Sequence, residues 1–506
     1  MKPPGSRGRE AVNAALVAIA GYRPSRRERP PAFDYRPPGG PDAGRAVPPG
    51  PDGALRRERG SIAAAADDLR RGHTTSRHLV ERAIDAIARR DPQLSAVVHL
   101  MGGEALDAAD AWDAELAAGR DRGPLHGIPV TVKDIIHVAG APTRAGSAVF
   151  EEVPDADSEA VARLRAGGAV ILAKVSTHEF ALGVTTPQSR NPHDECRIPG
   201  GSSGGSAIAV STGMGLGSLA TDTRASIRVP AAFCGVVGFK PTFGAVPTSG
   251  IVPNSWTMDH VGPLTRTVGD AAAFLDVLTA GRSRLRPWVG SPVAGLRIGV
   301  PESTFDCADH EVAVGVRAAL AMAEGLGCTV RTASRPSAED LDSANAVGMI
   351  VSRCEAATFH RGLGADRSQY WEEVADQLGA AEGIRAMDYL DAQRMRADMT
   401  EDLLASFEHH DILAMPTVPV VAPLVEDFAR YLVILSRTTT LWSLTGFPAI
   451  SVPCGFVRGL PYAIQLVAPP WREDLLVALG SAVQRATMGS ALGLEPATAL
   501  ARDDVA

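Results

Sequence analysis

Three side chains stand in sequence settings that suit nucleophilic chemistry. Ser202 lies in the run Pro199-Gly-Gly-Ser-Ser-Gly-Gly-Ser-Ala207, and Ser226 follows it twenty-four residues later in TDTRASIRVP. Lys133 ends the apolar stretch IPVTV. A serine hydroxyl becomes a useful nucleophile only when a nearby base takes its proton, and a buried lysine can be that base. Together, these residues suggest covalent catalysis through a serine.

Other common sites fit these residues less well. Ser226 has no plausible histidine-centred triad around it and no G-x-S-x-G elbow. The run Gly213-Met-Gly-Leu-Gly217 is not a dinucleotide-binding loop, and no Walker lysine follows it. Close helix packing explains these glycines better. The Gly/Ser run that holds Ser202 leads into AIAVSTGMGLGSLA, so we expect it to enter a buried helix rather than to be a linker.

The strand that ends at Lys133 belongs to a strand–helix–strand pattern. Residues 128–132 predict a strand, 159–166 a helix closed by Gly167-Gly168, and 169–173 a second strand. Such crossover units build parallel sheets with helices on their faces. Sheets of this kind place ligands beyond the carboxyl ends of their strands, which is where Lys133 lies.

The pattern continues along most of the chain and predicts the fold class. An earlier helix covers Leu79 to Ile87, with Thr75 or Ser76 as N-cap and Pro92 as its stop. Further predicted elements are strands at 296–300, 328–331, 411–415, 449–452 and 462–467, and a helix at 311–326. We therefore expect an α/β fold with a large, twisted, mixed and mostly parallel central sheet, flanked by helices on both faces.

Composition limits the class of protein. The 506 residues carry a net charge of −8, which argues against binding that depends on neutralising nucleic-acid phosphates. The sequence contains no run of about 18 apolar residues, so we predict no transmembrane helix. Six scattered cysteines, without a C-x-x-C pair, indicate free thiols in a reducing compartment and no metal site. We expect a cytoplasmic protein that uses no cofactor.

The chain divides into three predicted parts. Residues 1–60 hold twelve Lys/Arg and six Asp/Glu and form a basic, Pro/Gly/Arg-rich arm that we expect to be partly disordered or extended. At its start, AVNAALVAIA follows basic residues but is interrupted by Asn13, which favours an amphipathic helix over a signal peptide. Residues 61–490 form a single catalytic domain, and 491–506 a tail.

The motifs around the three candidate residues resemble the amidase signature family. GGSSGGSA, TDT-x-x-SIRVPAAFCGVVGFKPT and the upstream PVTVKD carry the resemblance. Other blocks agree in order: AGAPTRAGS, LAKVSTHEFALG, Asn191-Pro192, SWTMDHVGPLTRTVGDAA, DILAMPTVP and TGFPAISVPCGF. The resemblance covers roughly residues 61–490.

Carried over position by position, the resemblance implies a catalytic relay. Ser226 matches the nucleophile, Ser202 the bridging serine on a cis peptide bond, and Lys133 the base. Neutral Lys133 would draw a proton from Ser202, which draws one from Ser226, and burial would keep the lysine neutral. Asp134 need not pair with Lys133, because successive side chains on a strand point to opposite faces.

The resemblance also implies supporting residues. Backbone N–H groups would form the oxyanion hole. A second set of residues would support the loop that carries Ser226 or would contact the substrate. His178 and His260 lie in family blocks but have no catalytic task, so we expect packing or hydrogen-bonding roles. The implied oxyanion residues are Thr223, Arg224, Ala225 and Ser226, and the implied supporting residues are Ser203, Thr221, Asp222 and Arg228. For Arg228, an ion pair with Asp222 is an equal alternative to substrate contact.

The sequence departs from the family just before the nucleophile. Where the family usually has Gly-Gly, this chain has Arg224-Ala225. If that position needs a positive φ, Ala225 is strained by about 1–2 kcal/mol. We favour altered specificity, with Arg224 shaping the acyl pocket or attracting an anionic substrate, over an impaired hydrolase or an acyl or amido transferase.

Three functions remain open from sequence. The first is an amidase acting on a linear amide-type C–N bond of a small molecule; aliphatic, aryl, ureido, hydrazide and biosynthetic amides are all candidates. The second is the glutamine-hydrolysing subunit of an aminoacyl-tRNA amidotransferase, which typically keeps both glycines. The third is a non-catalytic scaffold with the same fold. The resemblance also implies a possible homodimer.

Overall fold

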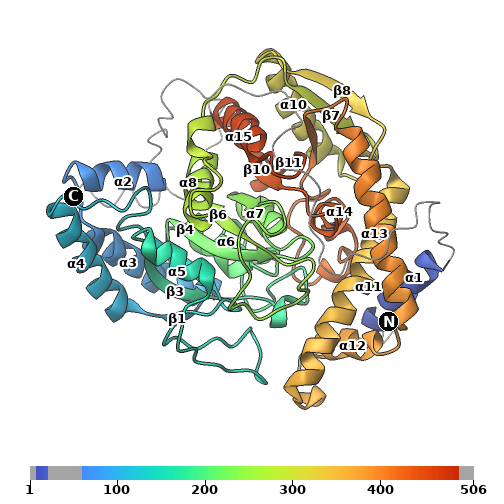
Figure 1. Ribbon diagram of the computed structural model, residues 1–506, viewed down its shortest axis with the longest axis horizontal. Helices are drawn as coiled ribbons and strands as arrows, with labels where there is room; N and C mark the ends of the chain where they lie inside the picture. Colours follow the sequence, from blue (N-terminus) through green and yellow to red (C-terminus); the bar gives the residue numbers. More distant parts are fainter. Residues whose placement is uncertain (1–6, 21–59, 489–506) are drawn as a thin grey trace.

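A single sheet of eleven strands runs through the computed structural model, which describes residues 7–20 and 60–488 (Figure 1). Most of the predicted basic arm and the whole predicted tail lie outside the described residues. In sheet order the strands are β1 (Val97–Leu100), β3 (Val170–Val175), β2 (Pro129–Lys133), β4 (Gly217–Asp222), β6 (His260–Thr265), β5 (Val237–Lys240), β10 (Ala449–Val457), β11 (Leu460–Val467), β9 (Ile412–Pro416), β7 (Arg297–Pro301) and β8 (Thr329–Ala333).

The sheet is mixed, as predicted, but parallel pairs do not predominate. Parallel pairing joins β2 to β3 and β4, and β7 to β8 and β9. Antiparallel pairs link these two blocks through β6, β5, β10 and β11. The predicted majority of parallel pairs is wrong because crossovers were recognised only at β2–α5–β3 and β7–α10–β8, whereas the middle of the sheet pairs through connections of other kinds.

Helices cover both faces of the sheet, and successive buried side chains along a strand point to alternate faces. On β4, Leu219 belongs to one core and Ala220 to the other, as expected when successive residues point to opposite faces. The helices are α2 (Ile62–Arg70), α3 (Ser76–Leu94), α4 (Gly102–Ala117), α5 (Glu159–Ala166), α6 (Gly204–Thr212), α7 (Arg228–Cys234), α8 (Val268–Leu278), α9 (Ser303–Asp306), α10 (His310–Gly325), α11 (Ala338–Leu363), α12 (Glu372–Ala381), α13 (Ala386–Ser406), α14 (Thr440–Leu444) and α15 (Glu473–Met488).

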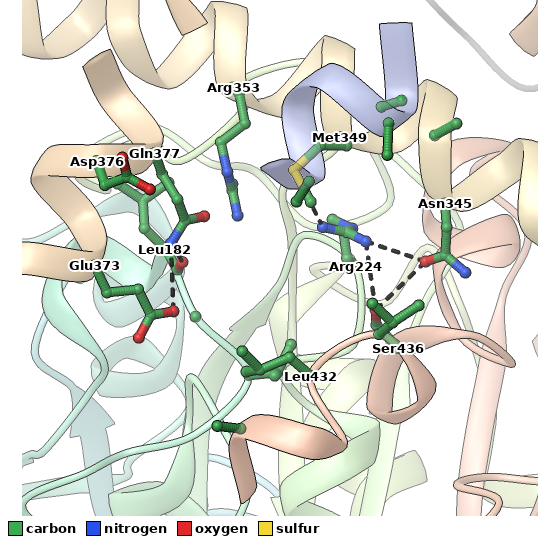
Figure 2. A pocket seen from close by; sticks show the side chains of 18 of the residues that line it. Leu182, Arg224, Asn345, Met349, Arg353, Glu373, Asp376, Gln377, Leu432 and Ser436 are labelled. Atoms are coloured by element: carbon green, nitrogen blue, oxygen red, sulfur yellow. Dashed lines mark hydrogen bonds between the residues drawn. The ribbon is translucent and has the colours of Figure 1, made fainter. Parts of the chain in front are cut away.

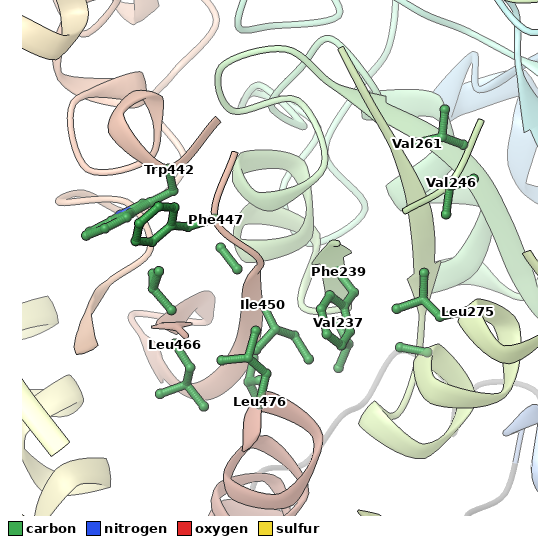
Figure 3. Packing of buried hydrophobic residues seen from close by; sticks show 14 of the residues in the cluster. Val237, Phe239, Val246, Val261, Leu275, Trp442, Phe447, Ile450, Leu466 and Leu476 are labelled. Atoms are coloured by element: carbon green, nitrogen blue, oxygen red, sulfur yellow. The ribbon is translucent and has the colours of Figure 1, made fainter. Parts of the chain in front are cut away.

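The larger core joins strands to helices that are distant in sequence. Helices α8, α10 and α15 contribute to it, whereas α3, α6 and α7 contribute to the core of the other face. Figure 3 shows part of the larger core, where Phe239 of β5 and Ile450 of β10 lie near Leu476 of α15. The larger core packs on β2 through Val130 and Val132, and both cores pack on β4, so they position the two strands on which the candidate site depends.

The predicted helix that begins at Thr75 runs further than expected. Thr75 is its N-cap, and its hydroxyl accepts a hydrogen bond from His78 N at 3.0 Å, but the helix continues through Pro92 to Leu94. The prediction of Pro92 as the stop is wrong. The helix ends instead at Ser95, whose φ of 52° leaves the helical region and whose N–H still bonds to Asp91 O.

The predicted N-terminal helix is present as α1 (Arg7–Ile19). It packs on α11 and α12 and lies beside them in Figure 1, far from α2, the next described helix in the chain. Val12, Ala15 and Ile19 of α1 are buried. The start of the predicted arm is therefore part of the folded body.

In the described parts of the chain, no helix combines the length and the apolar character that crossing a bilayer requires.

Candidate functional site

Lys133 and Thr221 lie toward the carboxyl ends of two neighbouring parallel strands. Lys133 is the last residue of β2, and Thr221 is on β4, with Val132 and Leu219 as register partners. The Lys133 Nζ lies 2.9 Å from Thr221 Oγ1 and 2.7 Å from Ser202 Oγ. Lys133 and Thr221 are 88 positions apart in sequence, and the parallel pairing of β2 and β4 brings them together. Lys133 also contacts the Gly/Ser loop through Ser202.

Burial makes Lys133 a weak acid that readily loses its proton. Its side chain is fully buried, and desolvation lowers its pKa from 10.5 to about 7, against the attraction of the Asp259 and Asp222 carboxylates. No carboxylate of the described residues lies within 4.0 Å of Nζ. Asp134 instead forms an ion pair of 2.9 Å with Lys174 on β3. A substantial fraction of Lys133 is therefore neutral near pH 7.

The Gly/Ser loop (residues 199–203) is held by close backbone packing. The peptide bond between Gly201 and Ser202 is cis, at the position where the resemblance places it. A Cβ at Gly201 would overlap the Thr185 backbone, so no larger residue fits there. The loop leads into α6, all of whose residues are buried, as expected for a loop that enters a core helix. Ser203 Oγ donates to Thr221 O at 3.1 Å, which joins the loop to β4.

Ser226 lies in the nucleophile loop (residues 223–227), between β4 and α7. An ion pair anchors this loop from below: Arg228 Nε and Nη2 donate to the two Asp222 carboxylate oxygens at 3.0 Å each, and both residues are fully buried. Arg228 Nη2 also donates to Arg224 O at 3.1 Å. Of the two alternatives for Arg228, the structure contains the ion pair with Asp222.

The backbone of the nucleophile loop offers unused donors. The N–H groups of Thr223, Arg224, Ala225 and Ser226 donate no hydrogen bond to any described residue, whereas that of Ile227 donates to Asp222. Neither Arg224 nor Ala225 has a positive φ, so the strain that would follow from one does not arise. Ala225 is fully buried in a cluster with Val229 and Phe233, where its methyl group fits.

Ser226 itself is 5% exposed, whereas Ser202 and Lys133 are not exposed at all. Within the described residues, the hydroxyl of Ser226 makes no hydrogen bond to Ser202. Lys133 thus contacts Ser202, whereas the described residues show no hydrogen bond between Ser202 and Ser226. Catalytic hydrogen bonds are often longer in unliganded enzymes and shorten with substrate.

Two histidines and one acid complete the surroundings of the site. His178 packs edge-on against Trp371, and His260 Nδ1 lies 2.7 Å from Met258 O, so both have the packing and hydrogen-bonding surroundings expected. Asp259 was missed as a functional candidate, although it lies in the quoted SWTMDHVG block. It accepts a hydrogen bond from Thr223 Oγ1 at 2.6 Å, and desolvation raises its pKa to about 6.

Replacing Arg228 with methionine is expected to lower the free energy of unfolding by about 3–5 kcal/mol, because Asp222 would stay buried without its partner. Chemical denaturation measures the change. Arg77→Met is the matched control: Arg77 pairs with Asp110 on the surface and should leave stability close to that of the parent. Equal stability of Arg228→Met and the parent would contradict the anchoring role.

A mixed sheet that carries a buried lysine, a serine on a cis peptide bond and a second serine beyond the next strand is the arrangement expected of the amidase-signature type. The model of the Amidase family matches residues 78–477. The chain belongs to the Amidase family and is an amidase-type hydrolase.

Its relatives include two kinds of protein. A glutamyl-tRNA(Gln) amidotransferase subunit of the A type, from Roseiflexus sp. (strain RS-1), is 36% identical over 475 residues, covering 84% of this chain and 96% of the relative. An amidase from Pseudomonas putida is 36% identical over 451 residues, with the same coverage of both chains. A crystal structure of an amidase superposes with a TM-score of 0.78 at 34% identity, covering 84% of this chain and 100% of its own.

Proposed function

We propose that this protein hydrolyses the C–N bond of a small-molecule amide through an ester on Ser226, with Ser202 and Lys133 as its proton relay. One observation carries the proposal: Lys133 Nζ lies 2.7 Å from Ser202 Oγ, buried and without a carboxylate of the described residues in ion-pair reach. Burial without a contacting carboxylate favours the neutral form of a lysine, whose amine lone pair can then accept a proton near neutral pH.

In the first half of the reaction, Ser226 Oγ attacks the amide carbonyl carbon. Its proton passes to Ser202, whose own proton passes to Lys133. The carbonyl oxygen takes up negative charge, and in this scheme the unused N–H groups at 223–226 donate hydrogen bonds to it. The relay then returns a proton to the leaving nitrogen, the C–N bond breaks, and an amine or ammonia departs from the Ser226 ester.

In the second half, water replaces the amine. Its oxygen attacks the ester carbon while the relay takes its proton, and the C–O bond to Ser226 breaks as that proton returns to Ser226 Oγ. The products are a carboxylic acid and the amine, so atoms balance with one water consumed per amide cleaved. No cofactor takes part in this scheme.

Labelling with a fluorophosphonate probe tests the proposal, because the probe reacts only with an activated serine. We expect one adduct, located on Ser226 by mass spectrometry, lost in Ser226→Ala and weakened in Ser202→Ala and Lys133→Ala. An amide panel should then give an acyl adduct on the same residue. Ser211→Ala, on the far end of α6, is the control that should label normally. If the parent stays unlabelled at high probe concentration, the chain is a scaffold and the proposal fails.

The amidotransferase alternative predicts a different result. The Roseiflexus relative is named as a subunit of such an enzyme, but Arg224 and Ala225 replace the glycines that glutaminase subunits typically keep. Glutaminase activity that emerges only on adding the partner subunits would favour this alternative. We place the proposed reaction in the cytoplasm, since all six cysteines are free thiols, and we expect small molecules rather than nucleic acids as its substrates.

A further inference from the structure

A cavity of about 440 Å³ opens beside the nucleophile loop, a volume typical of small-molecule sites. Its wall includes Arg224 from that loop, Asn345, Met349 and Arg353 from α11, and Ser436 from the segment before α14. Helix α1 contributes Ala14 and neighbouring alanines on another side. Arg224 is two residues before Ser226, so their Cα atoms are at most about 7 Å apart.

Two guanidinium groups extend into this cavity (Figure 2). Arg353 is 5% exposed, and its Nε has no hydrogen-bond partner among the described residues. The Nε of Arg224 is likewise buried without a partner, while its Nη2 donates to Asn345 Oδ1 at 3.0 Å and to Ser436 Oγ at 3.4 Å. No carboxylate of the described residues lies within 4.0 Å of either guanidinium.

Four acidic side chains also line the cavity, Asp342, Glu372, Glu373 and Asp376, and none of them lies within 4.0 Å of either guanidinium. Asp342 lies 2.9 Å from Arg437, and Asp376 accepts a hydrogen bond from the backbone N–H of Arg9 at 3.0 Å. Glu373 accepts one from Gln377 at 3.4 Å and lies 3.9 Å from His178 Nε2. Glu373 attracts Arg353 only from beyond ion-pair distance. The described residues therefore leave both guanidinium groups of the cavity without a carboxylate at contact range.

We propose that Arg224 and Arg353 form a carboxylate subsite, so that the preferred substrates are amides that carry a carboxylate on the same small molecule. The inference rests on the proposed function and names the substrate class of that site. A carboxylate accepts paired hydrogen bonds from a guanidinium fork, and the guanidinium of Arg353, which donates no hydrogen bond to a described residue, lines the cavity and can supply that fork.

The cost of the arrangement supports a binding role over a structural one. A buried guanidinium that no carboxylate contacts destabilises a fold, and an anionic ligand that compensates the charge would offset this cost. Desolvation lowers the pKa of Arg224 to about 10 and that of Arg353 to about 9, and repulsion by Arg224 adds to the lowering at Arg353. An anion between the two guanidinium groups relieves both effects.

Matched substrates test the subsite. Glutaramate and pentanamide share chain length and scissile amide and differ in the carboxylate; succinamate and adipamate, with their neutral counterparts, vary the distance. In the parent, kcat/KM should favour at least one acid amide by about 100-fold over its neutral partner. Arg353→Gln and Arg224→Gln should each reduce the ratio of kcat/KM for the favoured acid amide to kcat/KM for its neutral partner to about threefold or less. The exposed Arg458→Gln is the control and should keep the preference.

A binding measurement separates this inference from the proposed function. Glutarate should raise the Tm of the parent and of Ser226→Ala, but not that of Arg353→Gln. If the neutral amides are hydrolysed as well as the acid amides at all three lengths, the subsite is wrong and the hydrolase stands. If no amide is cleaved while glutarate still stabilises the parent in an Arg353-dependent way, the hydrolase is wrong and the subsite stands. If Arg353→Gln does not fold, Arg224→Gln alone decides the result.

Discussion

Lys133→Met is expected to lower kcat/KM by at least about 10⁴-fold, the size of effect seen when one member of a catalytic relay is removed. Methionine fills much of the lysine volume but cannot accept the Ser202 proton. Steady-state kinetics on the best amide of the panel measure the loss. Activity within tenfold of the parent would show that another group takes the proton from Ser202.

The same substitution is expected to stabilise the fold. The pKa of Lys133 is about 7 in the folded protein and near 10.5 in the unfolded chain, so the unfolded chain binds more protons between those values. The free energy of unfolding of the parent therefore rises with pH across that window. Below pH 7 the protein bears the full cost of burying the charged ammonium group, on the order of 5 kcal/mol. Lys133→Met also loses two hydrogen bonds worth about 1 kcal/mol each, so its free energy of unfolding should exceed that of the parent by about 3 kcal/mol at pH 6.

Lys174→Met is the matched control for this gain. Lys174 is equally buried on the next strand but pairs with Asp134 at 2.9 Å. Its removal leaves that carboxylate buried alone and should cost about 3–5 kcal/mol. Chemical denaturation of both variants at pH 6 and pH 9 measures the contrast. If both variants lose stability, Lys133 is not the strained, unpaired amine that the relay requires.

The second large effect is on the pH dependence of the reaction. Only the neutral form of Lys133 can act as the base, so kcat/KM should rise tenfold per pH unit below about 7 and level off above it, because burial sets the pKa of Lys133 at about 7. At pH 5 the rate constant should be about 100-fold below its plateau. Pentanamide is the suitable substrate, since it does not titrate in this range. A flat profile from pH 5 to 8 would exclude Lys133 as the titrating base.

Asp259→Asn identifies the group responsible for that rise. The Asp259 carboxylate raises the pKa of Lys133 by attraction, so its replacement by a neutral amide should move the rise to lower pH. If the rise instead belonged to Asp259, whose own pKa is about 6, the variant would lose it. The direction of the change therefore assigns the titration.

Much of the site could be predicted from short segments of sequence. Lys133 ends β2 and Ser202 enters α6 through glycines, and the structure brings the two within 2.7 Å. Their local patterns, an apolar strand and a small-residue helix, determine where each side chain lies. The alternation of side chains on a strand also explained why Asp134 could be adjacent in sequence and yet pair with Lys174 instead.

Long-range pairing could not be predicted in the same way. Arg353 lies within a long helix, and nothing in its immediate sequence indicates that it lines the same cavity as Arg224, because that depends on how α11 packs over the nucleophile loop. Asp259 was overlooked for the same reason, since its effect on Lys133 acts through space. The middle of the sheet was misjudged because antiparallel pairing between β5, β6 and β10 leaves no local crossover pattern.

The position of α1 has a consequence for how this protein can diversify. The family model begins at residue 78, yet alanines of α1 line the same cavity as Arg224 of the nucleophile loop. The wall of the cavity and the bond-breaking machinery are thus encoded in separate stretches of the chain. Substitutions at the α1 alanines would therefore change the wall of the cavity without altering any residue of β2, the Gly/Ser loop or the nucleophile loop.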